Sequence, residues 1–91
     1  MTFISLLPNA PANLVASGET ASSVNLSWDA VEDSSGYDVY QDGTVVDTVV
    51  TNNYKVTGLT SATTYEFYVV AKSEKYTTES VPSNTVSVTT T

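Results

Sequence analysis

The sequence predicts an all-β domain, a seven-stranded antiparallel sandwich of two sheets, and three observations support that fold class. Threonine, serine and valine make up 41 of the 91 residues, and the β-branched members of this set favour strands over helices. Several segments alternate apolar and polar residues with a period of two, whereas none repeats apolar residues at the helical spacing. Turn-forming residues recur about every eight to twelve residues, which is typical of a small β-sandwich.

Four strands are predicted in the first half of the chain, at residues 13–17, 24–28, 37–41 and 44–50. Strict alternation at 24–28 places Val24, Leu26 and Trp28 on one face of the sheet. The Asp42-Gly43 pair favours a tight hairpin, because both residue types tolerate the positive φ angles of a two-residue turn. In the strand at 44–50, apolar residues occur at both odd and even positions, so the pattern does not decide which face of the strand points inward.

Three further strands are predicted at residues 54–56, 63–73 and 84–90. The longest of them alternates, so that two sets of its side chains face opposite ways. The inward set comprises Tyr65, Phe67, Val69 and Ala71, and the outward set comprises Glu66, Tyr68, Val70 and Lys72. The two halves of the chain together predict a core built around Trp28, Tyr37, Leu59, Tyr65 and Phe67.

Composition and charge exclude most kinds of functional site. The chain has ten acidic residues and three lysines and a net charge of -7, so nucleic acid and anionic membrane surfaces would repel it. It has no histidine, cysteine or arginine, which removes imidazole bases, thiolate nucleophiles and bidentate guanidinium groups. We therefore expect no catalytic residue, no cofactor and no metal site, and we expect the isolated domain to be a monomer.

One loop is acidic enough to raise the question of a cation. Asp29, Glu32 and Asp33 lie close together in the sequence, and grouped carboxylate oxygens are ligands that Ca²⁺ prefers. Their spacing matches no calcium-loop motif, so a solvated acidic loop is the favoured interpretation.

The N-terminal region is predicted to be a linker or an added leader over residues 1–11, followed by one domain over 12–91. Its apolar run at residues 3–7 is shorter than the core of a signal peptide and has no basic residue before it. No part of the chain approaches the roughly 20 apolar residues that span a bilayer. The sequence therefore predicts neither a signal peptide nor a membrane span within these residues.

Three groups of residues resemble a known family. Trp28 ends the second predicted strand, Gly-Tyr-Asp-Val-Tyr opens the third at 36–40, and Gly-Leu-Thr-Ser-Ala-Thr-Thr-Tyr-Glu-Phe occupies 58–67. This arrangement resembles a fibronectin type III domain, over about residues 10–91. An immunoglobulin domain is disfavoured, because antibody domains place a cysteine pair around their core tryptophan and this chain has no cysteine.

The segment at 59–65 is the most specific part of the resemblance. It implies a tyrosine corner, in which the hydroxyl of Tyr65 reaches back to a backbone group near Leu59 and holds the loop between the two sheets. The family often has Pro-Gly where this chain has Ser61-Ala62. That departure costs some rigidity in the loop.

Within the family, the chain resembles modules of bacterial secreted glycoside hydrolases and of phage tail proteins. The resemblance implies a non-catalytic spacer or interaction module of a larger extracellular protein, namely a bacterial polysaccharide-degrading enzyme, with neighbouring domains of the same polypeptide as its partners. Two alternatives stay open: a phage-tail surface module of the virion that adheres weakly to a cell-surface glycan, and an independent carbohydrate-binding domain. The integrin-binding function of animal modules needs Arg-Gly-Asp and is not implied, because the chain has no arginine.

The candidate ligand surface comprises Tyr40, Tyr68 and Val70. Alternation points both tyrosines outward, and fibronectin-like strand order makes their strands neighbours, so the two phenols should lie close together with Val70 beside them. Flat aromatic faces stack on the C–H faces of a polysaccharide or cell-surface glycan. Hydrogen bonds to sugar hydroxyls would come from Asp38, Glu66 or Lys72. The favoured alternative is structural, with the tyrosine pair stabilising the sheet or packing against a neighbouring domain.

Overall fold

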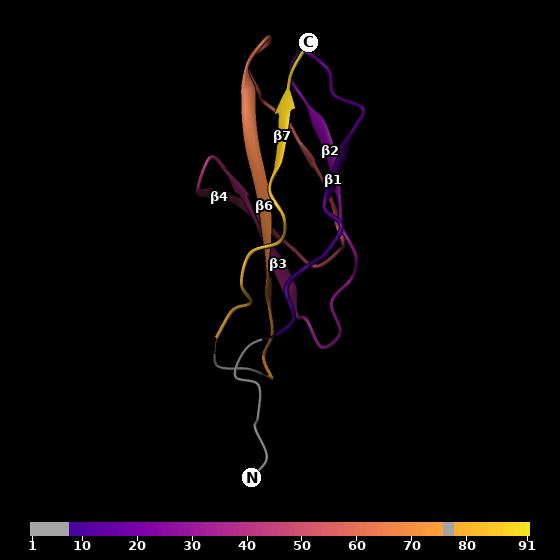
Figure 1. Cartoon of the computed structure of the whole chain (residues 1–91), viewed down its shortest axis with the longest axis vertical. Coiled ribbons are helices and arrows are strands. Elements are labelled where there is room, and N and C mark those ends of the chain that lie inside the picture. The colour runs from indigo at the N-terminus through magenta and orange to yellow at the C-terminus, as the bar shows by residue number, and fades with distance from the viewer. Residues whose placement is uncertain (1–7, 76–77) are drawn as a thin grey trace.

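The computed structural model describes residues 8–75 and 78–91, and within them seven strands form two antiparallel sheets (Figure 1). The strands are β1 Val15–Ser17, β2 Val24–Ser27, β3 Gly36–Gln41, β4 Thr44–Val49, β5 Asn53–Val56, β6 Thr64–Lys72 and β7 Val86–Thr89. The three-stranded sheet has the order β1-β2-β5, and the four-stranded sheet has the order β4-β3-β6-β7. The predicted all-β sandwich is therefore confirmed.

The core lies between the two sheets and consists of the inward side chains of each strand. Alternation along β2, for example, buries Val24 and Leu26 and exposes the residues between and after them. Trp28 packs edge to face on Tyr37, with ring centroids 5.4 Å apart and ring planes at 70°. Tyr65 is half-buried and lies at the margin of the core. The buried cluster comprises Leu14, Val24, Leu26, Trp28, Tyr37, Val39, Val56, Leu59, Phe67, Val69, Ala71 and Val88.

The first strand starts later than the predicted range of 13–17. Asn13 has a φ of 57°, which is in the left-handed region and interrupts an extended strand. The backbone of Leu14 then bonds to a side chain: its N–H donates to Asn84 Oδ1 at 3.0 Å, and its C=O accepts from Asn84 Nδ2 at 3.0 Å. Pairing of β1 with β2 consequently begins at Val15.

A β-bulge sets the inward face of β4, which alternation alone left open. The register between β3 and β4 shifts after Val39, and one β4 residue, Val46, has no partner across the ladder. Val49 packs against the core, whereas Val45 and Val46 are 43% and 42% exposed. The extra residue changes the phase of the alternation within the strand, and this accounts for apolar residues at both parities.

Serine hydroxyls extend the hydrogen bonding of β6 beyond the point where β7 pairs with it. The N–H of Val69 donates to Ser83 Oγ at 2.9 Å, and the N–H of Ala71 donates to Ser80 Oγ at 2.8 Å. In return, Ser83 and Ser80 donate their own N–H groups to the C=O groups of Val69 and Ala71, at 2.8 and 3.0 Å. The hydroxyls thus replace the carbonyl groups that a regular strand would offer to these buried amides.

The tyrosine corner implied by the resemblance is present. The hydroxyl of Tyr65 accepts a hydrogen bond from the N–H of Thr60 at 2.8 Å. The neighbouring Leu59 is buried, and its N–H donates to the C=O of Ser22 at 2.9 Å, on the loop before β2. These two bonds fix the β5–β6 loop to the three-stranded sheet on one side and to β6 on the other.

The two ends of the described chain lie at opposite ends of the sandwich (Figure 1). Part of the predicted linker, residues 1–7, lies outside the described residues. Within the rest of it, Pro8 and Pro11 are buried. No helix that is long and apolar enough to cross a membrane occurs in the described ranges.

Candidate functional site

The outer surface of the four-stranded sheet carries an aromatic pair near its centre. Tyr40 on β3 and Tyr68 on β6 are direct cross-strand partners, and their rings stack with centroids 4.6 Å apart and planes at 9°. They face outward because the adjacent residues Val39 and Val69 point into the core. Both tyrosines are half-buried. A stacked pair of this kind contributes about 0.5–1.5 kcal/mol beyond the area that it buries.

Stacking decides which ring surfaces remain open to a ligand. Each ring covers one face of the other, which leaves one outer face on each ring together with the ring edges. The outer face of Tyr40 is on the side of β4, where its cross-strand partner Val45 is exposed. A sugar would therefore stack on one side of the pair or lie across its edges.

Val70 lies on the same sheet surface but is buried, with 5% of its surface exposed. Alternation predicted the direction in which it points, and burial by its neighbours could not be read from that pattern. Val70 therefore offers little contact area to a ligand.

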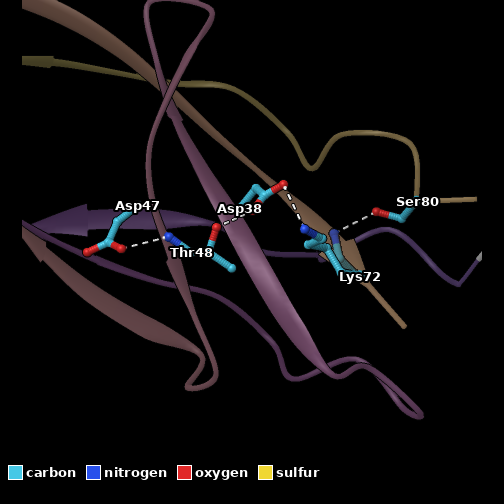
Figure 2. A network of polar contacts seen from close by, with 6 residues as sticks. Asp38, Asp47, Thr48, Lys72 and Ser80 are labelled. Carbon is cyan, nitrogen blue, oxygen red and sulfur yellow. Dashed lines mark hydrogen bonds and ion pairs between the residues drawn. The ribbon is translucent and has the colours of Figure 1, made fainter. Parts of the chain in front are cut away.

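A polar network around Asp38, two residues before Tyr40 on β3, is shown in Figure 2. Asp38, which is 7% exposed, accepts a hydrogen bond from Thr48 Oγ1 at 2.6 Å on one carboxylate oxygen. Its other oxygen faces Lys72 Nζ at 3.8 Å. The N–H of Thr48 in turn donates to the carboxylate of Asp47 at 2.8 Å. Asp38 is therefore committed to contacts within the sheet, and of the three polar residues predicted to bond sugar hydroxyls, Glu66 and Lys72 are the more accessible.

The surroundings of Tyr40 raise the pKa of its hydroxyl above the ordinary value of 10.0. Burial is the largest cause, and the carboxylates of Glu79 and Asp38 and the hydroxyl of Tyr68 add to it. Glu66 lies on the same face of β6 as Tyr68, two residues before it. We call the surface formed by Tyr40, Tyr68, Val70, Glu66 and Glu79 the tyrosine face.

Sequence reasoning did not include Glu79 in this surface. The residue lies in the loop between β6 and β7, well away from both tyrosines in the sequence. A loop residue has no periodic pattern from which its direction can be predicted. Only the structure brings its charge near the Tyr40 hydroxyl.

The acidic loop of Asp29, Glu32 and Asp33 uses two of its carboxylates in local contacts. Asp29 Oδ2 accepts a hydrogen bond from Asn13 Nδ2 at 2.6 Å, and Asp33 Oδ2 pairs with Lys75 Nζ at 3.1 Å. Across residues 8–75 and 78–91, no three side chains of metal-binding type come together.

The same loop is organised by a buried hydroxyl that sequence reasoning treated only as part of a core side chain. The hydroxyl of Tyr37 accepts hydrogen bonds from the N–H of Val31 at 2.8 Å and from Ser34 Oγ at 3.0 Å. Tyr37 therefore connects the core to the loop that carries the acidic residues.

Comparison with known proteins agrees with this fold. Residues 9–88 match the fibronectin type III domain family. The chain is 47% identical over 68 residues to chitinase Chi52 of Paenibacillus xylanexedens, covering 71% of this chain and 13% of that protein. It is 40% identical over 82 residues to a poly(3-hydroxybutyrate) depolymerase of Ralstonia pickettii, covering 90% of this chain and 17% of that protein.

A solved structure extends the likeness to three dimensions. An Fn3-like protein from Clostridium thermocellum superposes with a TM-score of 0.80 at 25% identity, over 92% of this chain and 94% of that chain. The curated relatives are bacterial enzymes named for a polysaccharide and a polyester, and the chain spans only a small part of each. Sandwich topology, tyrosine corner and sequence match agree, and the chain belongs to the fibronectin type III family.

Proposed function

We propose that this chain is a non-catalytic spacer and interaction module of a larger extracellular protein, a bacterial enzyme that degrades a polysaccharide. Two facts support the proposal. The relatives that it matches are polymer-degrading enzymes in which similar sequence makes up 13% and 17% of the protein. No histidine, cysteine or arginine is present to build a catalytic centre.

The observation that carries the proposal is the position of the two chain ends. The described chain enters at one end of the sandwich and leaves at the other (Figure 1). A rigid domain with its ends placed in this way holds the domains before and after it about one domain length apart. Rigidity comes from the closed core and from the bonds of the Asn84 side chain to Leu14, which join the segments that lead into the first and last strands.

Deletion of the module from the protein that contains it tests this role. We expect a variant without residues 9–88 to hydrolyse soluble oligomers at the original rate and to hydrolyse the insoluble polymer more slowly. Replacing the module by an unrelated domain of similar length should restore part of that rate, because a spacer acts through distance. Hydrolysis by the isolated chain, or an unchanged rate on the insoluble polymer after deletion, would contradict the proposal.

A second candidate function is weak binding of glycans, and the half-buried Tyr40–Tyr68 stack on the outer surface of the sheet favours it. It is compatible with the spacer role and with the alternative of a phage-tail surface module. The coding sequence on either side of this chain distinguishes the spacer in an enzyme from the phage-tail module. A neighbouring hydrolase domain would support the first role, and a neighbouring virion domain would support the second. The enzyme would be secreted to the extracellular space, whereas the phage module would be part of the virion.

A further inference from the structure

The tyrosine face carries negative charge that the rest of the sheet does not balance. Glu66 and Glu79 are exposed, and among the described residues neither carboxylate has an ion pair. The three lysines of the chain lie elsewhere or are engaged. Lys72 faces Asp38, Lys75 pairs with Asp33, and Lys55 is on β5 in the other sheet.

The electrostatic field of nearby carboxylates reaches the aromatic pair. Glu79 and Asp38 both raise the pKa of the Tyr40 hydroxyl, so their field reaches the edge of the aromatic pair. The flat face of a tyrosine ring attracts a cation through the quadrupole of the ring, and nearby carboxylates add to that attraction. The combination favours a positively charged group over a neutral hydroxyl, and the net charge of -7 favours it further at long range.

The shape of the surface selects the kind of molecule that carries this charge. The outer faces of Tyr40 and Tyr68 are flat apolar surfaces about one ring wide, and Val45 continues the apolar surface beside Tyr40. A sugar ring offers a C–H face of matching size, whereas a lysine side chain is thin and mobile and loses more conformational entropy on binding. A polymer of amino sugars presents flat C–H faces and ammonium groups together.

We propose that the tyrosine face binds a polysaccharide that contains 2-amino sugars with free, protonated amines. The inference rests on the proposed place of the module in an extracellular polymer-degrading enzyme. The outer ring faces of Tyr40 and Tyr68 stack on the sugars, and Glu66 and Glu79 pair with their ammonium groups. N-acetylation removes the positive charge and keeps the ring, so an acetylated polymer binds more weakly.

Titration of the ¹⁵N-labelled chain with a glucosamine hexamer tests the proposal, at a pH at which the amines are protonated. We expect saturable amide shifts confined to the tyrosine face. An N-acetylglucosamine hexamer should bind about tenfold more weakly, and so should a hexalysine peptide of comparable charge. Equal affinity for the acetylated hexamer would contradict the role of the charge. Equal affinity for hexalysine would show that positive charge alone is recognised and would contradict the role of the sugar rings.

Paired variants locate the binding surface. We expect Glu79→Gln to weaken binding of the glucosamine hexamer about two- to fivefold, and Tyr68→Leu to weaken it about tenfold. Glu19→Gln is the matched control, because it changes the net charge equally from an exposed turn of the other sheet and should have no effect. An equal loss in Glu19→Gln would show that only net charge matters and would overturn the proposal.

This outcome is separable from that of the spacer proposal. Thermal melting of each variant verifies that it is folded before titration. If the hexamer does not bind while deletion of the module still slows hydrolysis of the insoluble polymer, only the binding inference fails. If the hexamer binds and deletion has no effect, the spacer role fails and the binding inference stands.

Discussion

Replacing Tyr37 and, separately, Tyr65 by phenylalanine removes the same oxygen atom from two tyrosines in different surroundings. Each hydroxyl accepts a backbone N–H at 2.8 Å, from Val31 and from Thr60 respectively. Tyr37 is only 2% exposed, and its hydroxyl takes a second hydrogen bond from Ser34. Thr60 is exposed to water. We therefore expect Tyr37→Phe to be the more destabilising substitution.

The structure gives an order of magnitude for the two effects. In Tyr65→Phe, water can replace the lost acceptor at the exposed N–H of Thr60, so the free energy of unfolding falls by about 0.5–1.5 kcal/mol. In Tyr37→Phe, the partly buried N–H of Val31 loses its partner and a second bond is lost as well, so the loss is about 2–3 kcal/mol. With a urea dependence of about 1 kcal/mol per molar, the two midpoints differ by about 1.5 M.

Urea unfolding followed by fluorescence measures this difference, because Trp28 is the single tryptophan of the chain and lies in the core. Tyr68→Phe serves as the control, since the Tyr68 hydroxyl has no hydrogen bond to any of the described residues, and its midpoint should not change measurably. A loss in Tyr65→Phe equal to that in Tyr37→Phe, with unchanged urea dependence, would refute the argument that burial sets the cost.

Three other predictions follow from the same structure. Trp28→Ala empties a buried site and should cost about 3–5 kcal/mol, and a thermal melt close to that of the original chain would contradict this. Asn84→Ala removes both hydrogen bonds to Leu14 and should lower the free energy of unfolding by about 1–3 kcal/mol in urea, whereas an unchanged midpoint would show that water replaces both bonds. Because the pKa of Tyr40 is raised, the folded state holds this proton more tightly than the unfolded state, so stability present below pH 10 falls as the pH rises above it. NMR titration that follows the ring signals of Tyr40 should show a lower Tyr40 pKa in Glu79→Gln, and an unchanged value would exclude the contribution of that carboxylate.

The strands of this fold could be predicted because their pattern is local. Alternation over four or more residues decides which side chains enter the core, as at Val24 and Leu26, and no distant residue changes that choice. The ends of the strands depend on distant groups. Asn84 lies 70 positions from Leu14 and shortens β1 by bonding its backbone, and nothing in the sequence near residue 14 reveals that partner.

The candidate site was predictable to a lesser degree. Alternation gave the outward direction of Tyr40 and Tyr68, and the family resemblance made their strands neighbours. Ring orientation depends on side-chain torsions that no periodic pattern encodes, so the parallel stack could not be foreseen. The approach of Glu79 depends on the path of the loop after β6, where Ser80 bonds to Ala71, and the burial of Val70 depends on neighbours that alternation does not describe.

The bonds between Leu14 and Asn84 matter most when the chain is stretched. Tension between neighbouring domains would enter the sandwich near its first and last strands, where this amide holds both backbone groups of one residue. Both bonds must break before the chain at Leu14 can separate from the segment at Asn84. One asparagine side chain thereby adds to the resistance of this end of the domain to a mechanical load.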